Sequence, residues 1–214
     1  MTILALEFSS EERSVAVARG GIVAAEEVET GRRTTAAFAM IEKVLARARM
    51  EREEIEAVAV GLGPGSYTGV RAAIAIAQGW QLARGIKTLG VSSVAAIVVR
   101  AQAEKNFGRV NVVVNAQRGE FYFTTCEITE TGRREIEPLK ILPLEDVQVR
   151  TAGEILIGPE AAKFFPNGRT FFPRAAAVAG LATGGDTAAG EKLEPIYLRE
   201  TNFVKAGSML PKSC

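Results

Sequence analysis

Residues 61–71 of this 214-residue chain, GLGPGSYTGVR, have the composition of a phosphate-binding loop. Glycines and a proline make a tight turn that lets the backbone approach a ligand closely. The loop follows the apolar run 55–60, which is typical of a buried strand, and precedes an alanine-rich run typical of a helix. The N–H groups at such a helix start favour an anion. The residues that we expect to contact phosphate are Gly63, Gly65, Ser66, Thr68, Gly69 and Arg71.

The loop matches neither of two well-known phosphate-binding patterns. It contains no lysine, so it differs from Gly-x-x-x-x-Gly-Lys-Ser/Thr, and Ser66 stands where Gly-x-Gly-x-x-Gly requires its third glycine. The same residues also fit a tight strand-to-helix turn with a polar cap and no ligand. Arg71 begins the helix and opposes its dipole, which favours a partner for this side chain.

The composition excludes several kinds of site. The chain contains no histidine, which rules out Ser-His-Asp and Cys-His relays and histidine-ligated metals. Two cysteines, Cys126 and Cys214, make no disulfide framework. Water held on carboxylates, or a metal–carboxylate cluster, is not excluded by composition. We nevertheless expect no catalytic residue, no metal and no cofactor. The net charge of +1 provides no general basic surface for nucleic acid. Without a leader-like start or a long apolar run, we expect a cytoplasmic protein with no membrane segment.

The elements that position the loop form a first α/β unit. A strand at 3–8 is followed by a hairpin whose strands meet at Gly20–Gly21. A helix starts at a cap, Thr34 or Thr35, and reaches about residue 50. Its apolar positions recur at helical spacing on one face. They are Ala37, Ile41, Val44, Leu45 and Ala48. Further on, we expect a strand at 87–91 and a third helix, capped by Ser92 or Ser93, that reaches about residue 104.

The second half of the chain repeats this opening in outline. An apolar strand over 110–115 ends in a polar residue and is followed by strands at 121–128 and 135–142. A short strand at 155–157 and two helices, at 159–165 and 174–182, complete this half. The repetition predicts two related α/β lobes, 1–106 and a smaller, more irregular 107–214.

Four segments resemble the TsaB family, also called YeaZ, whose members act in tRNA threonylcarbamoyladenosine synthesis. They are GPGSYTGVR at 63–71, ILALEFSS at 3–10, NAQRGEFY at 115–122 and EPIYLR at 194–199. Their order and spacing fit nearly the whole chain. The resemblance implies a two-lobed actin-like (ribonuclease H-like) fold with duplicated mixed sheets flanked by helices.

The chain departs from the family at both strand tips. Actin-like nucleotidases usually carry aspartates there, whereas this chain has Glu7 and Asn115. The neutral Asn115 leaves a cation short of ligands. Glu7 fits either a cation ligand or, as we favour, a solvated carboxylate at a strand end. Both tips are interpreted as vestigial.

Small and apolar residues cover the alanine-rich helix nearly all round. One side packs on a sheet, and the other requires more of the chain or a partner. The first helix carries a second, narrower apolar stripe. Together the two helices predict half of a four-helix interface, an arrangement that the resemblance to the family also implies. The expected interface residues are Ala36, Met40, Ala72, Ala73, Ile76, Ala77 and Trp80. An entirely internal core explains the same pattern.

The resemblance implies a non-catalytic scaffold subunit of a tRNA threonylcarbamoyltransferase complex. Its partners are a TsaD homologue in a heterodimer, a TsaE-type ATPase, and tRNA reached indirectly; a homodimer is a further expectation. The modified nucleotide is the adenosine beside the anticodon of tRNAs that read codons beginning with A. The alternative is an ATP-dependent nucleotidase or transferase that uses the glycine loop and Glu7. A glycoprotease-type peptidase fits poorly, because no nucleophile–base pair is visible in the sequence.

Overall fold

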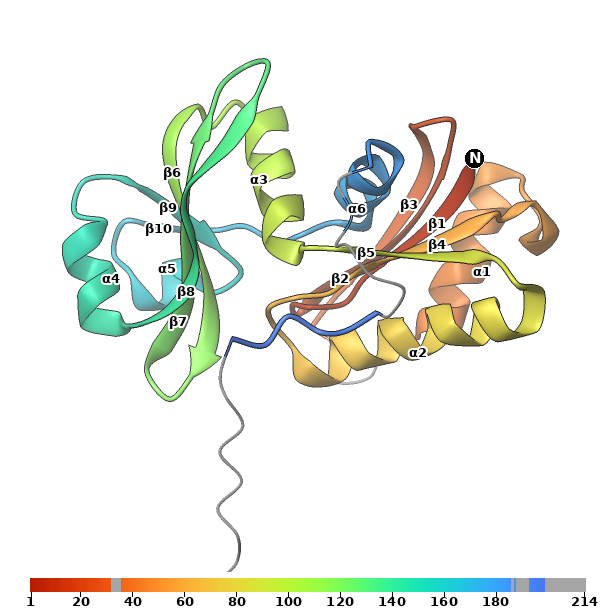
Figure 1. The fold of residues 1–214 in the computed structure, drawn as a ribbon, viewed down its shortest axis with the longest axis horizontal. Helices are drawn as coiled ribbons and strands as arrows, with labels where there is room; N and C mark the ends of the chain where they lie inside the picture. Colours follow the sequence, from red (N-terminus) through yellow and green to blue (C-terminus); the bar gives the residue numbers. More distant parts are fainter. Residues whose placement is uncertain (32–35, 186, 188–192, 199–214) are drawn as a thin grey trace, which may run out of the picture.

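Each half of the chain builds a five-stranded sheet, and the two sheets have the same strand order (Figure 1). The computed structural model describes residues 1–31, 36–185, 187 and 193–198. In the first sheet the order is β3-β2-β1-β4-β5, and in the second it is β8-β7-β6-β9-β10. In each, three antiparallel strands are followed by two parallel ones. This duplication confirms the predicted two-lobed architecture.

The first sheet contains β1 (Thr2–Glu7), β2 (Glu12–Arg19), β3 (Ile22–Thr30), β4 (Ala57–Gly61) and β5 (Lys87–Val91). Its strands alternate between two different faces. Large side chains such as Leu4, Val17 and Val60 face one side, whereas small ones such as Ala5 and Ala59 face the other. The alternation follows from the two-residue period of a strand and allows different helices to cover each face.

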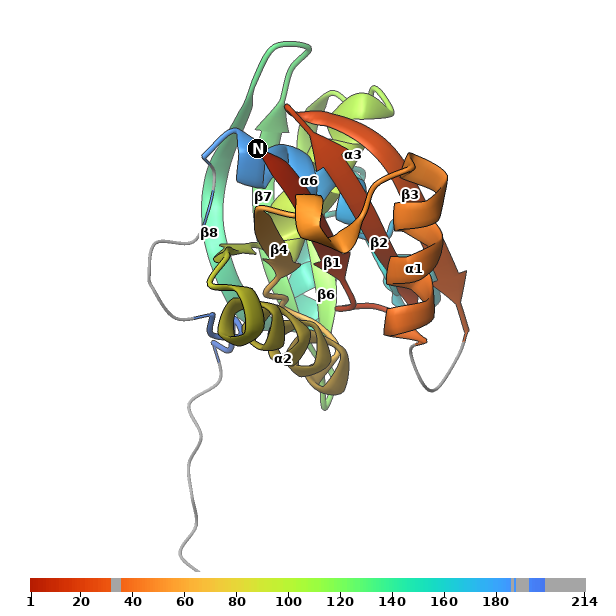
Figure 2. The ribbon, with the colours of Figure 1, turned by 90° about the vertical axis from the view of Figure 1, so that its right-hand side faces the viewer.

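Helices α1 (Ala37–Ala48) and α2 (Tyr67–Arg84) cover the face with large side chains (Figure 2). The apolar stripe predicted for α1 is confirmed, with its residues buried or, at Ala48, half-buried in this core. Its predicted caps, Thr34 and Thr35, lie outside the described residues. Ala36 occupies the cap position without a side-chain hydrogen bond. A short turn, η1 (Arg52–Glu54), connects α1 to β4.

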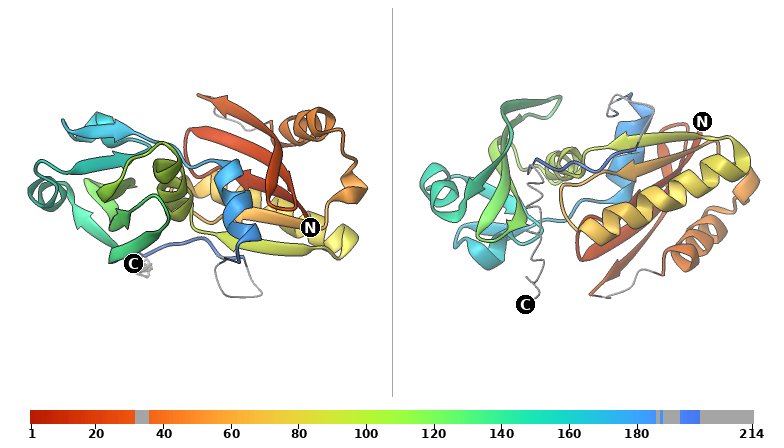
Figure 3. Two further views of the ribbon diagram at one scale, coloured as in Figure 1. Left: turned by 90° about the horizontal axis from the view of Figure 1, so that it is seen from above. Right: turned by 60° about the horizontal axis from the view of Figure 1, so that its bottom comes forward.

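The opposite face of the first sheet is covered by α6 (Ala175–Thr183), from the far end of the chain. The alanines on both partners allow a close approach between this helix and the sheet. Figure 3 shows α6 and α3 (Ser93–Ala103) between the two sheets. Ser92 caps α3 as predicted, since its side chain accepts a hydrogen bond from the Ala95 N–H. The expected second domain was 107–214. In the structure residues 107–174 form the second lobe, and α6 then packs on the first sheet.

The second sheet contains β6 (Gly108–Gln117), β7 (Glu120–Ile128), β8 (Arg133–Pro143), β9 (Ile155–Gly158) and β10 (Gly168–Thr170). One face packs on the apolar side of α3. The other packs on α4 (Leu144–Arg150) and α5 (Ala161–Phe164), where Phe121 makes edge contacts with Phe164 and Phe165 at centroid distances of 5.1 and 5.0 Å. The sequence did not predict α4 and β10, which are too short to show a clear period.

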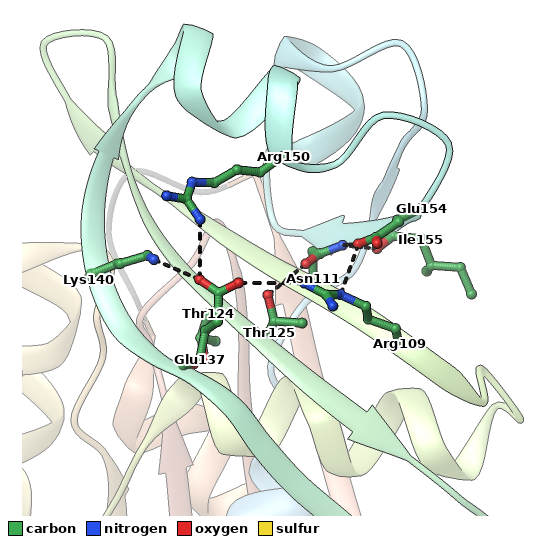
Figure 4. Close-up of polar contacts among 9 residues, drawn as sticks. All are labelled: Arg109, Asn111, Thr124, Thr125, Glu137, Lys140, Arg150, Glu154 and Ile155. Carbon is green, nitrogen blue, oxygen red and sulfur yellow. Dashed lines mark hydrogen bonds and ion pairs between the residues drawn. The ribbon is translucent and has the colours of Figure 1, made fainter.

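A polar network crosses the α4 side of the second sheet (Figure 4). Glu137 on β8 lies 2.6 Å from Lys140 and 3.5 Å from both Arg109 and Arg150. Beside it, the buried Asn111 donates to Glu154 at 2.7 Å and accepts from the Thr125 hydroxyl at 2.8 Å. The network satisfies polar groups that β6 and β7 place among apolar ones.

No helix in the described part of the chain is long and apolar enough to cross a membrane.

Candidate functional site

The glycine loop packs tightly against the turn between β1 and β2. Gly65 has φ of +152°, and a Cβ atom there would overlap the carbonyl oxygen of Ser9. The Ser66 N–H donates to that same oxygen at 2.6 Å. A Cβ at Gly69 would overlap the carbonyl oxygen of Phe8. These glycines therefore bring the start of α2 against the first strand, which agrees with a tight strand-to-helix turn.

Several groups of the loop are occupied within the protein. The Gly63 N–H donates to the Ser93 hydroxyl at 3.0 Å, and the Gly63 carbonyl accepts from the Ser93 N–H at 2.9 Å. Ser66 caps α2 by accepting from the Gly69 N–H at 3.2 Å. The Arg71 guanidinium lies 4.2 Å from the centroid of the Tyr67 ring, so this arginine has an aromatic partner.

A cavity of about 530 Å³ lies between the lobes beside this loop. Of the expected phosphate-contacting residues, only Gly65 and Ser66 are among those that line it. Thr68 is exposed on α2, while Gly63 and Gly69 are buried. The lining from the first lobe is Ser9, Ser10, Glu11, Arg13, Gly31, Gly65, Ser66 and Tyr67. The lining from the second lobe is Asn115, Ala116, Gln117, Tyr122 and Glu160.

Glu7 corrects one expectation, because its carboxylate is fully buried and not solvated. It accepts hydrogen bonds from the Ser9 N–H and the Ser93 hydroxyl, both at 2.8 Å. Gly61 leaves the space that this carboxylate occupies. Burial raises the pKa of Glu7, and the bonds from Ser9 and Ser93 act in the opposite direction. The described lining of the cavity does not include Glu7. Its hydrogen bonds connect the end of β1 to the turn that follows it and to α3.

Asn115, the other strand tip, lies at the cavity and stabilises a turn. Its side-chain oxygen accepts a hydrogen bond from the Gln117 N–H at 2.7 Å. Gln117 and Arg118 both have positive φ, at +65° and +59°, so the turn after β6 is sharp. The structure therefore brings Asn115 to the same cavity as the loop but does not bring Glu7 there.

Sequence reasoning missed Glu160, which lines the cavity just after β9. Burial raises the pKa of its carboxyl group, the Asn115 backbone hydrogen bond lowers it, and the charge of nearby Glu11 raises it. Its Oε2 atom is buried and has no hydrogen-bond partner in the part of the chain that the structure describes. The cavity lining therefore combines two carboxyl groups, Glu11 and Glu160, with one arginine, Arg13, and is not a uniformly positive site for an anion. The sequence signal was a polar residue directly after a strand, Gly158-Pro159-Glu160.

Within the described residues, no three His, Cys, Asp or Glu side chains gather closely enough to hold a metal ion.

The helix face differs in detail from the expected interface. The prediction was wrong for three of the expected interface residues. Met40, Ala73 and Ala77 are fully buried against the first sheet and cannot contact a partner. Ala36, Ala72, Ile76 and Trp80 are half-buried. Two large apolar residues that the sequence analysis did not select are exposed: Leu82 is 91% exposed and Phe38 is 70% exposed. The helical period places both side chains outside the buried faces of α1 and α2, on the solvent side.

Exposed apolar and small residues of α2 lie on the same helix as a groove of mixed apolar and charged lining that separates α1 from α2. Ala75, Gly79 and Leu82 are exposed on α2 at helical spacing. A groove of about 280 Å³ lies between α1 and α2. It is lined by Phe38, Ile41, Glu42, Arg52, Glu53, Gly79, Trp80, Ala83 and Arg84. We call Phe38, Ala75, Gly79, Leu82 and the groove the α1–α2 face.

Comparison with known proteins identifies the family. A family model described as "TsaD: tRNA N6-adenosine threonylcarbamoyltransferase" matches residues 4–199. The Escherichia coli tRNA threonylcarbamoyladenosine biosynthesis protein TsaB is 31% identical over 219 residues, covering 93% of this chain and 95% of that protein. The chain belongs to the TsaB (YeaZ) family. TsaB of Buchnera aphidicola is 30% identical, covering 67% of this chain and 71% of that protein.

Solved structures of TsaB (YeaZ) proteins agree. YeaZ from Pseudomonas aeruginosa superposes with a TM-score of 0.76 at 28% identity, covering 92% of this chain and 99% of that one. A second Pseudomonas aeruginosa structure, described as similar to peptidase YEAZ, gives a TM-score of 0.77 at 29% identity over the same shares. The actin-like fold expected from the resemblance is therefore confirmed.

Proposed function

We propose that this chain is a non-catalytic scaffold subunit in the biosynthesis of tRNA threonylcarbamoyladenosine. It binds a TsaD homologue through the α1–α2 face, in an assembly that includes a TsaE-type ATPase and reaches tRNA through the other subunits. The product is the modified adenosine beside the anticodon of tRNAs that read codons beginning with A. The names of the TsaB relatives support the pathway.

The exposed apolar stripe on α2 is the observation that supports the binding role. Leu82 is 91% exposed, so its side chain contributes almost no buried apolar area to the isolated chain. Phe38 on α1 is also mostly exposed, at 70%. Large apolar side chains exposed on two neighbouring helices are typical of interaction sites in soluble proteins. The small residues Ala75 and Gly79 between them let a partner helix approach α2 closely. Two adjacent helices can provide the roughly 800 Å² per partner that a stable interface needs.

The alternative function, an ATP-dependent nucleotidase or transferase, is less well supported. This function requires Glu7 as the cation ligand, but Glu7 is buried and hydrogen-bonded to Ser9 and Ser93. It also requires Arg71 in the phosphate loop, but the Arg71 guanidinium lies over the Tyr67 ring. The cavity also places Glu11 and Glu160 where a polyphosphate would meet them. We therefore expect purified protein to turn over ATP at background rates.

The test is Leu82→Glu, with Phe38→Glu as a second variant. Burying a new carboxylate at the centre of an apolar interface is expected to weaken binding to the TsaD homologue at least about tenfold. Binding is measured by isothermal titration calorimetry, self-association by light scattering, and modification by the threonylcarbamoyladenosine content of tRNA in a reconstituted reaction. The modification signal is expected to fall together with binding.

The matched control is Val149→Glu, because Val149 is an equally exposed apolar helix residue, at 79%, on α4 of the other lobe. It should bind and support modification as the wild type does. If both α1–α2 variants melt like the wild type and bind with unchanged affinity, the interface lies elsewhere. Robust ATP hydrolysis that survives removal of contaminating ATPases would favour the alternative function.

A further inference from the structure

The chain crosses between the lobes twice in the described part of the molecule. The first crossing joins α3 to β6 and the second joins β10 to α6 (Figure 1). Two-lobed proteins open and close by changing the backbone angles of a few residues at such crossings. The groups that hold the crossings therefore decide whether the cavity between the lobes can change shape.

Arg174, at the end of the second crossing, is held by the edge hairpin of the first sheet. Its Nη1 lies 2.7 Å from Glu12 Oε1 on β2, and its Nε lies 3.6 Å from Glu26 Oε2 on β3. The backbone directly after it is held by the same strands. The Ala175 N–H donates to the Ser14 hydroxyl at 2.8 Å, and the Ala176 N–H donates to Glu26 at 3.0 Å. The crossing is thus fixed to the first lobe by side-chain and backbone contacts.

Arg100 holds the same crossing from the other side. It lies on α3, whose apolar face packs on the second sheet. Its Nη1 donates to the Phe172 carbonyl at 3.1 Å, and its guanidinium lies 4.7 Å from the centroid of the Phe171 ring. The same Nη1 is 3.9 Å from Glu12 Oε1, so one carboxylate faces both arginines. Phe171 itself is buried in the core that α3 shares with the second sheet. The contacts therefore connect both lobes through one cluster.

These charges are shielded from solvent more than ordinary surface pairs are. The side chains of Arg100 and Arg174 are 29% and 28% exposed, and those of Glu12 and Glu26 are 17% and 20% exposed. The attraction between two opposite charges becomes stronger as water is excluded. A charged side chain that loses its partner in such an environment destabilises the protein. Rotating one lobe would separate Arg100 from Glu12, since Glu12 moves with the first sheet and Arg100 with α3 and the second. The Arg174 pairs hold the end of the crossing and its shared carboxylate, Glu12, in place on the first lobe.

We propose that Glu12, Glu26, Arg100 and Arg174 form a clamp that locks the angle between the lobes. The cavity then keeps its present opening and does not close around a ligand as a hinged two-lobed enzyme does. A partner bound to the α1–α2 face meets one rigid body. This inference concerns the lobe angle and stands apart from the proposed partner, so each can fail alone.

The test measures a distance across the cavity by pulsed electron paramagnetic resonance. Spin labels are attached at Thr68→Cys and Arg118→Cys, two exposed positions on opposite lobes, with Cys214→Ser in the background and Cys126 left buried. The wild-type clamp should give one narrow distance distribution. Glu12→Gln and Arg100→Gln should each increase its width about twofold or add a second distance.

The matched control is Arg109→Gln, which removes ion pairs that lie entirely within the second lobe. It should leave the distribution narrow. Thermal melting of every labelled protein identifies variants that are unfolded. If Arg100→Gln is among them, Glu12→Gln provides the test. A broad wild-type distribution, or folded clamp variants with the wild-type width, would overturn the proposal.

Discussion

The two sheets share a strand order and differ most in the helix that comes after the fourth strand of each lobe. In the first lobe β4 leads into the 18-residue α2, whereas in the second β9 leads into the 4-residue α5. The long helix packs on its sheet and still exposes a large apolar side chain, Leu82, to solvent. The short helix only fills the core beside Phe121. The same scaffold thus carries a long helix with exposed apolar residues in one lobe and a short, core-filling helix in the other.

The strand tips show a second contrast. The tip of β1 carries Glu7, buried and bonded inside the lobe, whereas the tip of β6 carries Asn115, which stabilises a turn at the cavity. Both lobes place a glycine at the end of the fourth strand. A Cβ at Gly61 would overlap the Glu7 carboxylate, and one at Gly158 would overlap the Val113 carbonyl oxygen. Equivalent glycines therefore make room for a side chain in one lobe and for backbone in the other.

The largest expected effect comes from Gly65→Val. The new side chain meets the Ser9 backbone at a φ that β-branched residues avoid, so we expect a loss of about 3–5 kcal/mol in the free energy of unfolding. Chemical denaturation measures it. Gly79→Ala on the same helix is the control, since nothing lies within 4 Å of the added methyl, and it should raise stability by up to about 1 kcal/mol. Equal effects of the two substitutions would contradict the tight contact between α2 and β1.

The second prediction concerns the pH dependence of Glu7→Gln. Burial raises the folded-state pKa of Glu7 above its value of 4.5 in the unfolded chain. The folded protein therefore binds the proton more tightly, and the wild type loses stability as the pH rises above 4.5. The difference in unfolding free energy, wild type minus variant, should decrease with rising pH by at most about 1.4 kcal/mol per pH unit.

Denaturation series at several pH values measure this difference. A difference for Glu7→Gln that grows with pH would show that the carboxylate is stabilised in its charged form.

The smallest expected effect concerns Glu137 in the second lobe, whose pKa is shifted in the direction opposite to that of Glu7. The hydrogen bond from Lys140, followed by the charges of Lys140, Arg150 and Arg109, lowers the pKa of Glu137 (Figure 4). Glu137→Gln should therefore cost about 0.5–1 kcal/mol at neutral pH, and this loss should vanish as the pH falls below 4.5. Thermal melting at neutral and acidic pH measures it. A loss that persists in acid would assign the role of Glu137 to packing.

Local pattern predicted most of the fold. The helical spacing of Ile41, Val44 and Leu45 fixed the buried face of α1, and the glycines at 63–69 marked the turn before α2. Long-range packing was not readable. Nothing in residues 174–182 indicates that this helix covers a sheet whose strands all lie in the first 91 residues of the chain. The site was predicted in part for the same reason: Gly65, Ser66 and Asn115 meet at the cavity, but the inward position of Glu7 and the contribution of Glu160 depend on tertiary contacts.

The position of α6 has a consequence for synthesis on the ribosome. The small-residue face of the first sheet, with Ile3, Ala16 and Ala59, stays uncovered until residues 175–183 have emerged. By then the whole second sheet has left the exit tunnel. The amino-terminal half of this protein is thus completed last, which reverses the usual vectorial order and exposes its nascent apolar surface to chaperones for most of translation.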